Sequence, residues 1–155
     1  MRLTLHTDYA LRTLIYLGLH TDRLVSIREV SKAYGISENH LVKIVHRLGQ
    51  GGFIDTLRGR NGGLRLARPA DQIQIGDVVR YTEEDMGLVA CMQAAQPGEQ
   101  GCILARACRL RGTLGEALGA FMQVLDRYTL ADMITSNERQ SLGAVHHPEQ
   151  ARSIV

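Results

Sequence analysis

Three cysteines lie within one short stretch of this 155-residue chain and are its most reactive side chains. Ten residues separate Cys91 from Cys102 and five separate Cys102 from Cys108, in a stretch whose proline and glycines indicate a loop. An odd number of cysteines cannot be fully paired within one chain, which excludes a disulfide scaffold. Zinc usually needs a Cys-x-x-Cys pair, absent here, whereas an iron-sulfur cluster tolerates looser spacing and non-cysteine ligands. Buried structural cysteines and a redox thiol switch stay open as alternatives.

A second set of side chains suits contact with DNA. One face of the third predicted helix carries Asn39, His40, Lys43 and Arg47. In a DNA groove an amide reads adenine, a guanidinium reads guanine and an ammonium meets phosphates. A solvated amphipathic helix shows the same pattern, so this face alone does not decide the function. The buried stripe of the same helix is predicted at Leu41, Ile44, Val45 and Leu48.

Three helices must position that face. Apolar spacing predicts a first helix over residues 8–20, with Thr7 as its N-cap. Ser26 and Glu29 form a capping box for a second helix over 27–34, which Gly35 ends in the left-handed conformation. Ser37 caps the third helix. Helix, glycine turn and helix are the signature of a helix-turn-helix.

A β-hairpin follows the third helix directly. Residues 53–57 and 64–66 read as two strands, and the intervening loop carries Arg58, Arg60 and Asn61. Asn61 and the two glycines after it are predicted to supply the positive-φ positions of a tight turn. A helix-turn-helix with such a hairpin is a winged helix, whose arginines reach a minor groove or phosphates. We therefore predict DNA binding for residues 1–70.

The charge of the chain is divided in the same way. Residues 1–70 hold 11 basic and 5 acidic side chains, a net charge of +6, whereas residues 71–155 carry a net charge of −4. A basic half joined to an acidic half favours a polyanion as partner of the first half.

The second half is predicted to hold the chain's longest helix. A short packing helix over 74–80 precedes an acidic run at 83–85, which is most simply solvated surface. Thr113 and Glu116 form a capping box for a helix over 113–134, whose apolar residues repeat at spacings of three and four. A twin subunit would cover this helix and set two recognition helices one DNA turn apart; packing onto its own domain is the alternative.

The predicted fold class is mainly α with a small β-hairpin wing (α+β). We expect a winged helix-turn-helix domain over 1–70, a short helix and cysteine loop over 71–112, a dimerisation helix over 113–134 and a flexible polar tail over 135–155. No apolar run is long enough to span a membrane, and no export signal is visible, so we expect a cytoplasmic protein without membrane contact.

Five stretches resemble the winged-helix iron-sulfur regulators, a family with IscR and NsrR branches. They are Thr7-Asp8-Tyr9-Ala10-Leu11-Arg12, Ser37-Glu38-Asn39-His40-Leu41-Val42-Lys43-Ile44, Arg58-Gly59-Arg60-Asn61-Gly62-Gly63-Leu64-Arg65-Leu66, Ile75-Gly76-Asp77-Val78-Val79-Arg80 and Tyr128-Thr129-Leu130-Ala131-Asp132. The IscR branch has a histidine just after the third cysteine, where this chain has Arg109, so the resemblance favours the NsrR branch. The gap between Cys91 and Cys102 is longer than is usual in the family.

The resemblance implies a homodimeric repressor with one iron-sulfur cluster per subunit, either 4Fe-4S or 2Fe-2S. Its ligands would be Cys91, Cys102, Cys108 and, from the opposite subunit, Asp8. Taken alone, a carboxylate such as Asp8 at a helix N-terminus is explained by the helix dipole. An oxygen ligand would be the weakest of the four and the readiest to leave, which suits a sensor.

The function implied is repression at a palindromic double-stranded DNA operator, relieved when nitric oxide nitrosylates the cluster. The candidate DNA-binding residues are Arg12, Ser37, Asn39, His40, Lys43, Arg47, Arg58, Arg60 and Asn61. A regulator of cluster assembly or of general redox stress is the alternative within this class. A cluster-carrying enzyme lacks support, because no nucleophile-base pair or cofactor loop is present, so we expect no catalysis. A cluster-free DNA-binding protein with inert cysteines is the third possibility.

Overall fold

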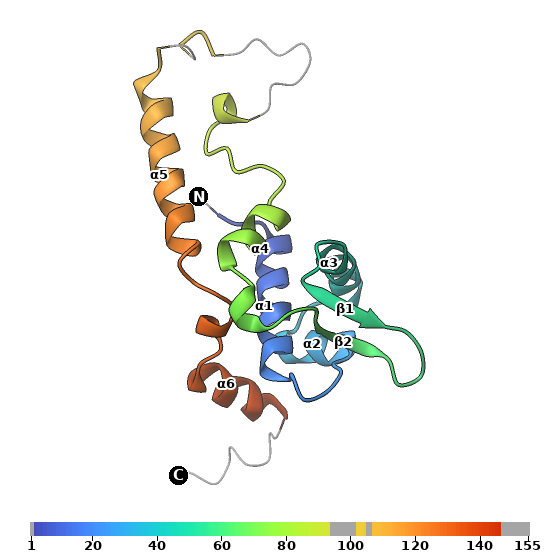
Figure 1. Ribbon diagram of the computed structural model, residues 1–155. Coiled ribbons are helices and arrows are strands. Elements are labelled where there is room, and N and C mark those ends of the chain that lie inside the picture. The colour runs from blue at the N-terminus through green and yellow to red at the C-terminus, as the bar shows by residue number, and fades with distance from the viewer. Residues whose placement is uncertain (1, 94–101, 105–106, 147–155) are drawn as a thin grey trace, which may run out of the picture.

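Helices dominate the computed structural model, which describes residues 2–93, 102–104 and 107–146 (Figure 1). The order of its elements is α1 (Leu5–Leu19), α2 (Ile27–Tyr34), α3 (Glu38–Gln50), β1 (Ile54–Leu57), β2 (Gly63–Leu66), η1 (Ala70–Gln72), α4 (Ile75–Thr82), η2 (Ala90–Met92), α5 (Arg109–Leu125), η3 (Ala131–Met133) and α6 (Ser136–His146). Within the described residues the sheet is the two-stranded antiparallel pair β1-β2. This confirms the predicted fold class. None of the described helices is long and apolar enough to cross a bilayer.

Helix α1 lies at the centre and contacts α2, α3, β2 and α4. Its inner side chains, Leu14, Tyr16 and Leu17, are almost completely buried. Figure 1 shows α1 and α4 between the wing on one side and α5 on the other. The DNA-binding elements and α5 are therefore joined through α1 and α4.

The start of α1 differs from the prediction. Thr4, and not Thr7, is the N-cap, because the Thr4 hydroxyl oxygen accepts a hydrogen bond from the backbone N–H of Thr7. Thr7 is fully buried, and its hydroxyl donates to the hydroxyl of Thr82 on α4 at 2.9 Å. The apolar periodicity could not reveal this, because the partner of Thr7 lies far along the chain.

The helix-turn-helix follows the prediction closely. The capping box of Ser26 and Glu29 is present, and Gly35 ends α2 with φ of 65°. Ser37 occupies the N-cap of α3 but makes no side-chain hydrogen bond there. The buried residues of α3 are the four predicted ones, Leu41, Ile44, Val45 and Leu48.

The wing pairs Ile54 with Leu66 and Leu57 with Gly63 in register. The predicted turn chemistry is wrong in detail, because the left-handed residue of the loop is Gly59, with φ of 112°, and neither Asn61 nor the glycines after it. Gly62 has a different role, since an added Cβ would lie 2.2 Å from the carbonyl oxygen of Leu57. The loop therefore needs glycine at one position for its dihedral angle and at another for close approach of the backbone.

Two backbone hydrogen bonds join the segment just before α4 to the segment just after α5. The N–H of Ile75 donates to the carbonyl of Tyr128, and the N–H of Leu130 donates to the carbonyl of Ile73. An isolated antiparallel bridge joins Gln74 to Thr129 between them. The chain segment that contains α4 and α5 therefore begins and ends at the same short backbone pairing.

Helix α5 begins four residues before the predicted start at Thr113. Cys108 is its N-cap, with the thiol sulfur accepting from the N–H of Arg111 at 3.4 Å, while the Thr113 hydroxyl donates to the carbonyl of Arg109 within the helix. The helix ends at Leu125, so residues 126–134 of the predicted helix form a turn and η3 instead.

The polar tail predicted for residues 135–155 contains a helix in its described part. Thr135 and Glu138 cap α6: the N–H of Thr135 donates to the Glu138 carboxylate, and the Thr135 hydroxyl accepts from the N–H of Asn137. Helix α6 contacts α2, and Leu142 packs on the core. Residues 147–155, also part of the predicted tail, lie outside the described residues.

Candidate DNA-binding surface and cysteine segment

The outer face of α3 is exposed along its first half. Ser37, Asn39, His40 and Lys43 all lie at the surface. The His40 ring stacks on Tyr9 of α1, with the ring centroids 6.2 Å apart. Beside them is a hollow of about 200 Å³, lined by Leu5, His6, Tyr9, His40, Lys43 and Ile44. Donors, acceptors and a positive charge therefore reach solvent together on one face, as a groove-reading helix requires.

Arg47 does not share that face. Its guanidinium donates from Nη2 to the carbonyl oxygen of Tyr81 at 3.0 Å and lies 5.2 Å from the centroid of the Tyr81 ring. The side chain is half-buried, and its Nε is buried without a partner among the described residues. The structure thus places this arginine of the recognition helix against α4, and a contact with DNA would require it to leave Tyr81.

The wing divides its arginines into two kinds. Arg65 pairs with Asp55 across the hairpin at 3.1 Å, and the Arg68 guanidinium lies 5.0 Å from the centroid of the Phe53 ring. Arg58 and Arg60, with Asn61, are exposed at the tip, and neither arginine forms an ion pair within the described residues. The two charges at the tip are the ones available to phosphates.

Asp8 and Arg12 form an ion pair one turn apart on α1. The Arg12 Nε donates to an Asp8 carboxylate oxygen at 2.9 Å, and the two side chains are 45% and 39% exposed. The Arg12 guanidinium also lies 5.9 Å from the centroid of the Tyr34 ring. The predicted role of Asp8 as a ligand would require this exposed pair to rearrange, whereas Arg12 bonds to Asp8 through Nε alone.

The three cysteines occupy different surroundings. Cys91 lies in η2, Cys108 caps α5 and Cys102 is exposed between them. All three thiols are free. Thiols are the usual ligands of an iron-sulfur cluster, so the types of donor fit the group that the resemblance implies. Within the described part of one chain, however, no three histidine, cysteine or carboxylate side chains converge as a ligand set.

The acidic run at residues 83–85 is more than the solvated surface expected. A carboxylate oxygen of Glu83 accepts from the N–H of Thr4 at 2.7 Å and from its hydroxyl at 3.1 Å. The run borders a hollow of about 410 Å³ whose lining also includes His6, Arg47 and Thr82. Burial and the nearby Arg47 guanidinium lower the pKa of His6. These contacts between the two predicted parts of the chain left no local signal in the sequence.

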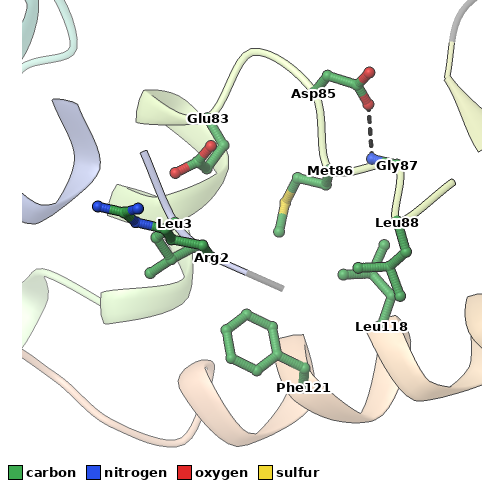
Figure 2. Close-up of a pocket in the computed structure, with 9 residues that line it drawn as sticks. All are labelled: Arg2, Leu3, Glu83, Asp85, Met86, Gly87, Leu88, Leu118 and Phe121. Atoms are coloured by element: carbon green, nitrogen blue, oxygen red, sulfur yellow. Dashed lines mark hydrogen bonds between the residues drawn. The ribbon is translucent and has the colours of Figure 1, made fainter. Parts of the chain in front are cut away.

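The stretch leading toward Cys91 packs on α5. Figure 2 shows Phe121 and Leu118 of α5 facing Met86 and Leu88 across a small hollow of about 150 Å³. The N–H of Gly87 donates to a carboxylate oxygen of Asp85 at 2.7 Å, which forms a tight turn there. The path from α4 to the cysteines is therefore held against the long helix.

A helix-turn-helix whose second helix exposes polar and basic groups, followed by a basic two-stranded wing, defines a winged-helix DNA-binding protein. The family model Rrf2, described as an iron-dependent transcriptional regulator, matches residues 3–136. The chain belongs to the Rrf2 family.

Curated relatives agree with this assignment. The chain is 52% identical over 143 residues to the HTH-type transcriptional regulator NsrR of Geobacillus kaustophilus, covering 92% of this chain and 94% of that protein. It is 47% identical over 139 residues to NsrR of Shouchella clausii, covering 89% and 91%. Because these homologues are named transcriptional regulators, we conclude that the protein is a DNA-binding transcriptional regulator and not an enzyme.

Solved structures share the fold. The cysteine regulator CymR of Bacillus subtilis superposes with a TM-score of 0.67 at 24% identity, over 86% of this chain and 96% of CymR. The IscR of T. potens gives a TM-score of 0.66 at 21% identity, over 100% of this chain and 93% of IscR.

Proposed function

We propose that the protein is a homodimeric, cytoplasmic repressor that binds a palindromic operator, holds one iron-sulfur cluster per subunit and releases DNA in response to nitric oxide. The observation that carries this proposal is the set of three free thiols on the stretch that joins α4 to α5 in a winged-helix regulator. Similarity to regulators named NsrR supports it.

The proposed dimer uses α5. Leu110, Ala117 and Val124 recur at seven-residue spacing and are all exposed, with Leu110 64% and Val124 43% accessible. Such spacing keeps apolar side chains on one face of a helix, which a second copy of α5 can cover. The neighbouring positions around the helix, Phe121, Met122 and Leu125, pack on the rest of the chain.

Cys91, Cys102 and Cys108 would hold the cluster, together with the partner subunit's Asp8. When bound, the cluster supplies iron that reacts with nitric oxide. Asp8 is paired with Arg12 in the structure and must leave that pair to act as a ligand. Since α1 packs on α3 and β2, a change in its first turn reaches both DNA-reading elements.

The DNA contacts we propose combine the two exposed sets. On α3, Ser37, Asn39, His40 and Lys43 face the groove. At the wing tip, Arg58, Arg60 and Asn61 reach the backbone or a minor groove. Arg12 on α1 is a further candidate.

Anaerobic purification tests the proposal. Iron content and visible absorbance are measured, an operator is selected from random-sequence DNA, and its retention is followed before and after stoichiometric nitric oxide. We expect an iron-loaded protein whose absorbance bleaches as DNA is released. Release on oxidative cluster loss but not with nitric oxide would instead indicate a general redox or cluster-assembly regulator, and a colourless protein that binds DNA throughout would contradict any cluster.

Two variants separate the ligands. Cys102→Ser should lose iron and the response to nitric oxide together. Asp8→Ala should keep most of the iron but alter release, because the carboxylate is the fourth and weakest ligand. Asp22→Ala, which changes an exposed aspartate in the turn after α1, is the matched control. If Asp8→Ala released DNA as the wild type does, the route through α1 would be wrong.

A further inference from the structure

The side chains of Arg47 and Tyr81 each donate a hydrogen bond to the other residue's backbone carbonyl. Arg47 donates to the carbonyl oxygen of Tyr81, and the Tyr81 hydroxyl donates to the carbonyl oxygen of Arg47, each at 3.0 Å. The same Arg47 carbonyl also accepts the N–H of Gly51, which ends α3. The recognition helix and α4, 34 residues apart in sequence, are thus joined by two reciprocal hydrogen bonds and a cation–π contact.

The Tyr81 ring reaches beyond Arg47 to the start of the wing. A Cβ added at Gly51 would lie 2.6 Å from the ring, so glycine is needed for this close approach. The ring centroid is 5.5 Å from that of Phe53, the residue directly before β1. One tyrosine on α4 therefore contacts the recognition helix, the turn after it and the base of the wing.

The residues after Tyr81 connect to the other side of the molecule. Thr82 accepts from the Thr7 hydroxyl and Glu83 accepts from Thr4, which bonds the end of α4 to the start of α1. The chain then runs through Met86 and Leu88, packed near α5, toward Cys91. This stretch is continuous with the end of α4, so a shift of it can act on Tyr81.

We propose that Tyr81 is a positioning residue with two roles. Its contacts with Arg47, Gly51 and Phe53 orient α3 and the wing relative to each other. It also transmits movement of the cysteine-bearing stretch to the DNA-reading face. The orienting role concerns DNA binding alone, while the transmitting role rests on the proposed function. This route runs through α4 and is separate from the one through Asp8.

Tyr81→Phe tests the orienting role, because it keeps the ring and removes only the hydroxyl that holds the Arg47 carbonyl. We expect roughly three- to tenfold weaker binding to the selected operator, the range for one lost hydrogen bond. Binding to random DNA, which depends on phosphate contacts, should change by less than about twofold. An equal loss on both DNAs, or no loss on either, would overturn the proposal.

Arg47→Met removes the other of the two hydrogen bonds, and combining the two changes gives a double-mutant cycle. Each change removes a different hydrogen bond between the same two residues, so both single variants and the double variant should lose affinity for the operator more than for random DNA. A loss in Arg47→Met that is equal on both DNAs would overturn the proposal. Tyr128→Phe, at a tyrosine 46% exposed beyond α5, is the matched control and should bind as the wild type does.

The transmitting role has its own measurement. The ratio of operator affinity before and after nitric oxide should fall toward one in Tyr81→Phe, and an unchanged ratio would overturn this role. If the wild type selects no operator, the proposed function has failed, and amide hydrogen exchange still decides the orienting role. Faster exchange at Gly51 and Phe53 in Tyr81→Phe, with α2 unchanged, would support that role, and unchanged exchange would overturn it.

Discussion

Glu29 holds the first turn of α2 with both of its carboxylate oxygens. One accepts from the N–H and the hydroxyl of Ser26, each at 3.0 Å, and the other accepts from Arg23 at 2.7 Å. Burial alone would raise the pKa of Glu29, but these hydrogen bonds together lower it. A lowered pKa in the folded state means that stabilisation is present above the unfolded pKa and is lost as the pH falls.

Glu29→Gln should therefore destabilise the protein by about 1 kcal/mol at pH 7, since it removes the charge from a capping box. The difference from the wild type should shrink as the pH falls below about 4.5, where the wild-type carboxylate also becomes protonated. Urea unfolding between pH 7 and pH 3 measures this. A difference that stays constant across this range would contradict the assignment.

The contact of Arg47 with Tyr81 could not be predicted from the spacing of residues along α3. Helical spacing correctly assigned the four buried residues of α3 and the exposure of Asn39, His40 and Lys43. Arg47 lies at the edge of that face, where a side chain can either extend into solvent or pack on a neighbouring element. Its neighbour is Tyr81, and no local rule connects residues so far apart in sequence.

The elements with strong local signals were predicted well. The capping box, the glycine stop after α2 and the two wing strands are where the sequence indicated. Where two local signals compete, prediction failed: Thr113 matches a cap but lies one turn inside α5, and Cys108 caps that helix with its sulfur. Thr135 and Glu138 form a cap at α6 that went unnoticed, because the apolar periodicity after it is weak. The dimer and the cluster remain predictions.

Replacing glycine by alanine should have opposite effects on stability in the wing and in α5. Gly62→Ala should destabilise the protein by about 1–3 kcal/mol and weaken DNA binding, since the new Cβ would lie 2.2 Å from the Leu57 carbonyl oxygen and the hairpin must deform. Gly112→Ala, on α5 with open space around the Cβ, should instead stabilise the helix by about 0.5–1 kcal/mol. Thermal unfolding with an operator titration distinguishes them, and equal effects at the two glycines would contradict the wing geometry.

At the scale of the whole molecule, the proposed dimer depends on the exposed apolar stripe of α5. Val124→Glu should convert the dimer to a monomer, because a charge on this face cannot be covered by a second apolar helix without a large desolvation penalty. Sedimentation velocity measures this at micromolar protein. Gln123→Glu places the same charge on the adjacent exposed residue and should leave the dimer intact. A dimer that persists in Val124→Glu would exclude this stripe as the interface.

The division of charge between the two halves predicts a steep salt dependence of DNA binding. Lys43→Ala and Arg60→Ala should each flatten the slope of log K against log salt by about 0.9 if each side chain neutralises one phosphate. Arg65→Ala should change the slope less, because Arg65 is already paired with Asp55. A slope near zero in the wild type would contradict the proposed role of the basic half.

The pairing of residues 73–75 with 128–130 makes the whole excursion from α4 through α5 a closed loop with fixed ends. The entropy of closing such a loop grows only with the logarithm of its length. A handful of residues added between Cys91 and Cys102 therefore costs less than about 0.6 kcal/mol, the cost of doubling a flexible loop. Insertions of this size are nearly neutral for the DNA-binding elements, so the stretch between these cysteines is free to diverge in length while the winged helix keeps its shape.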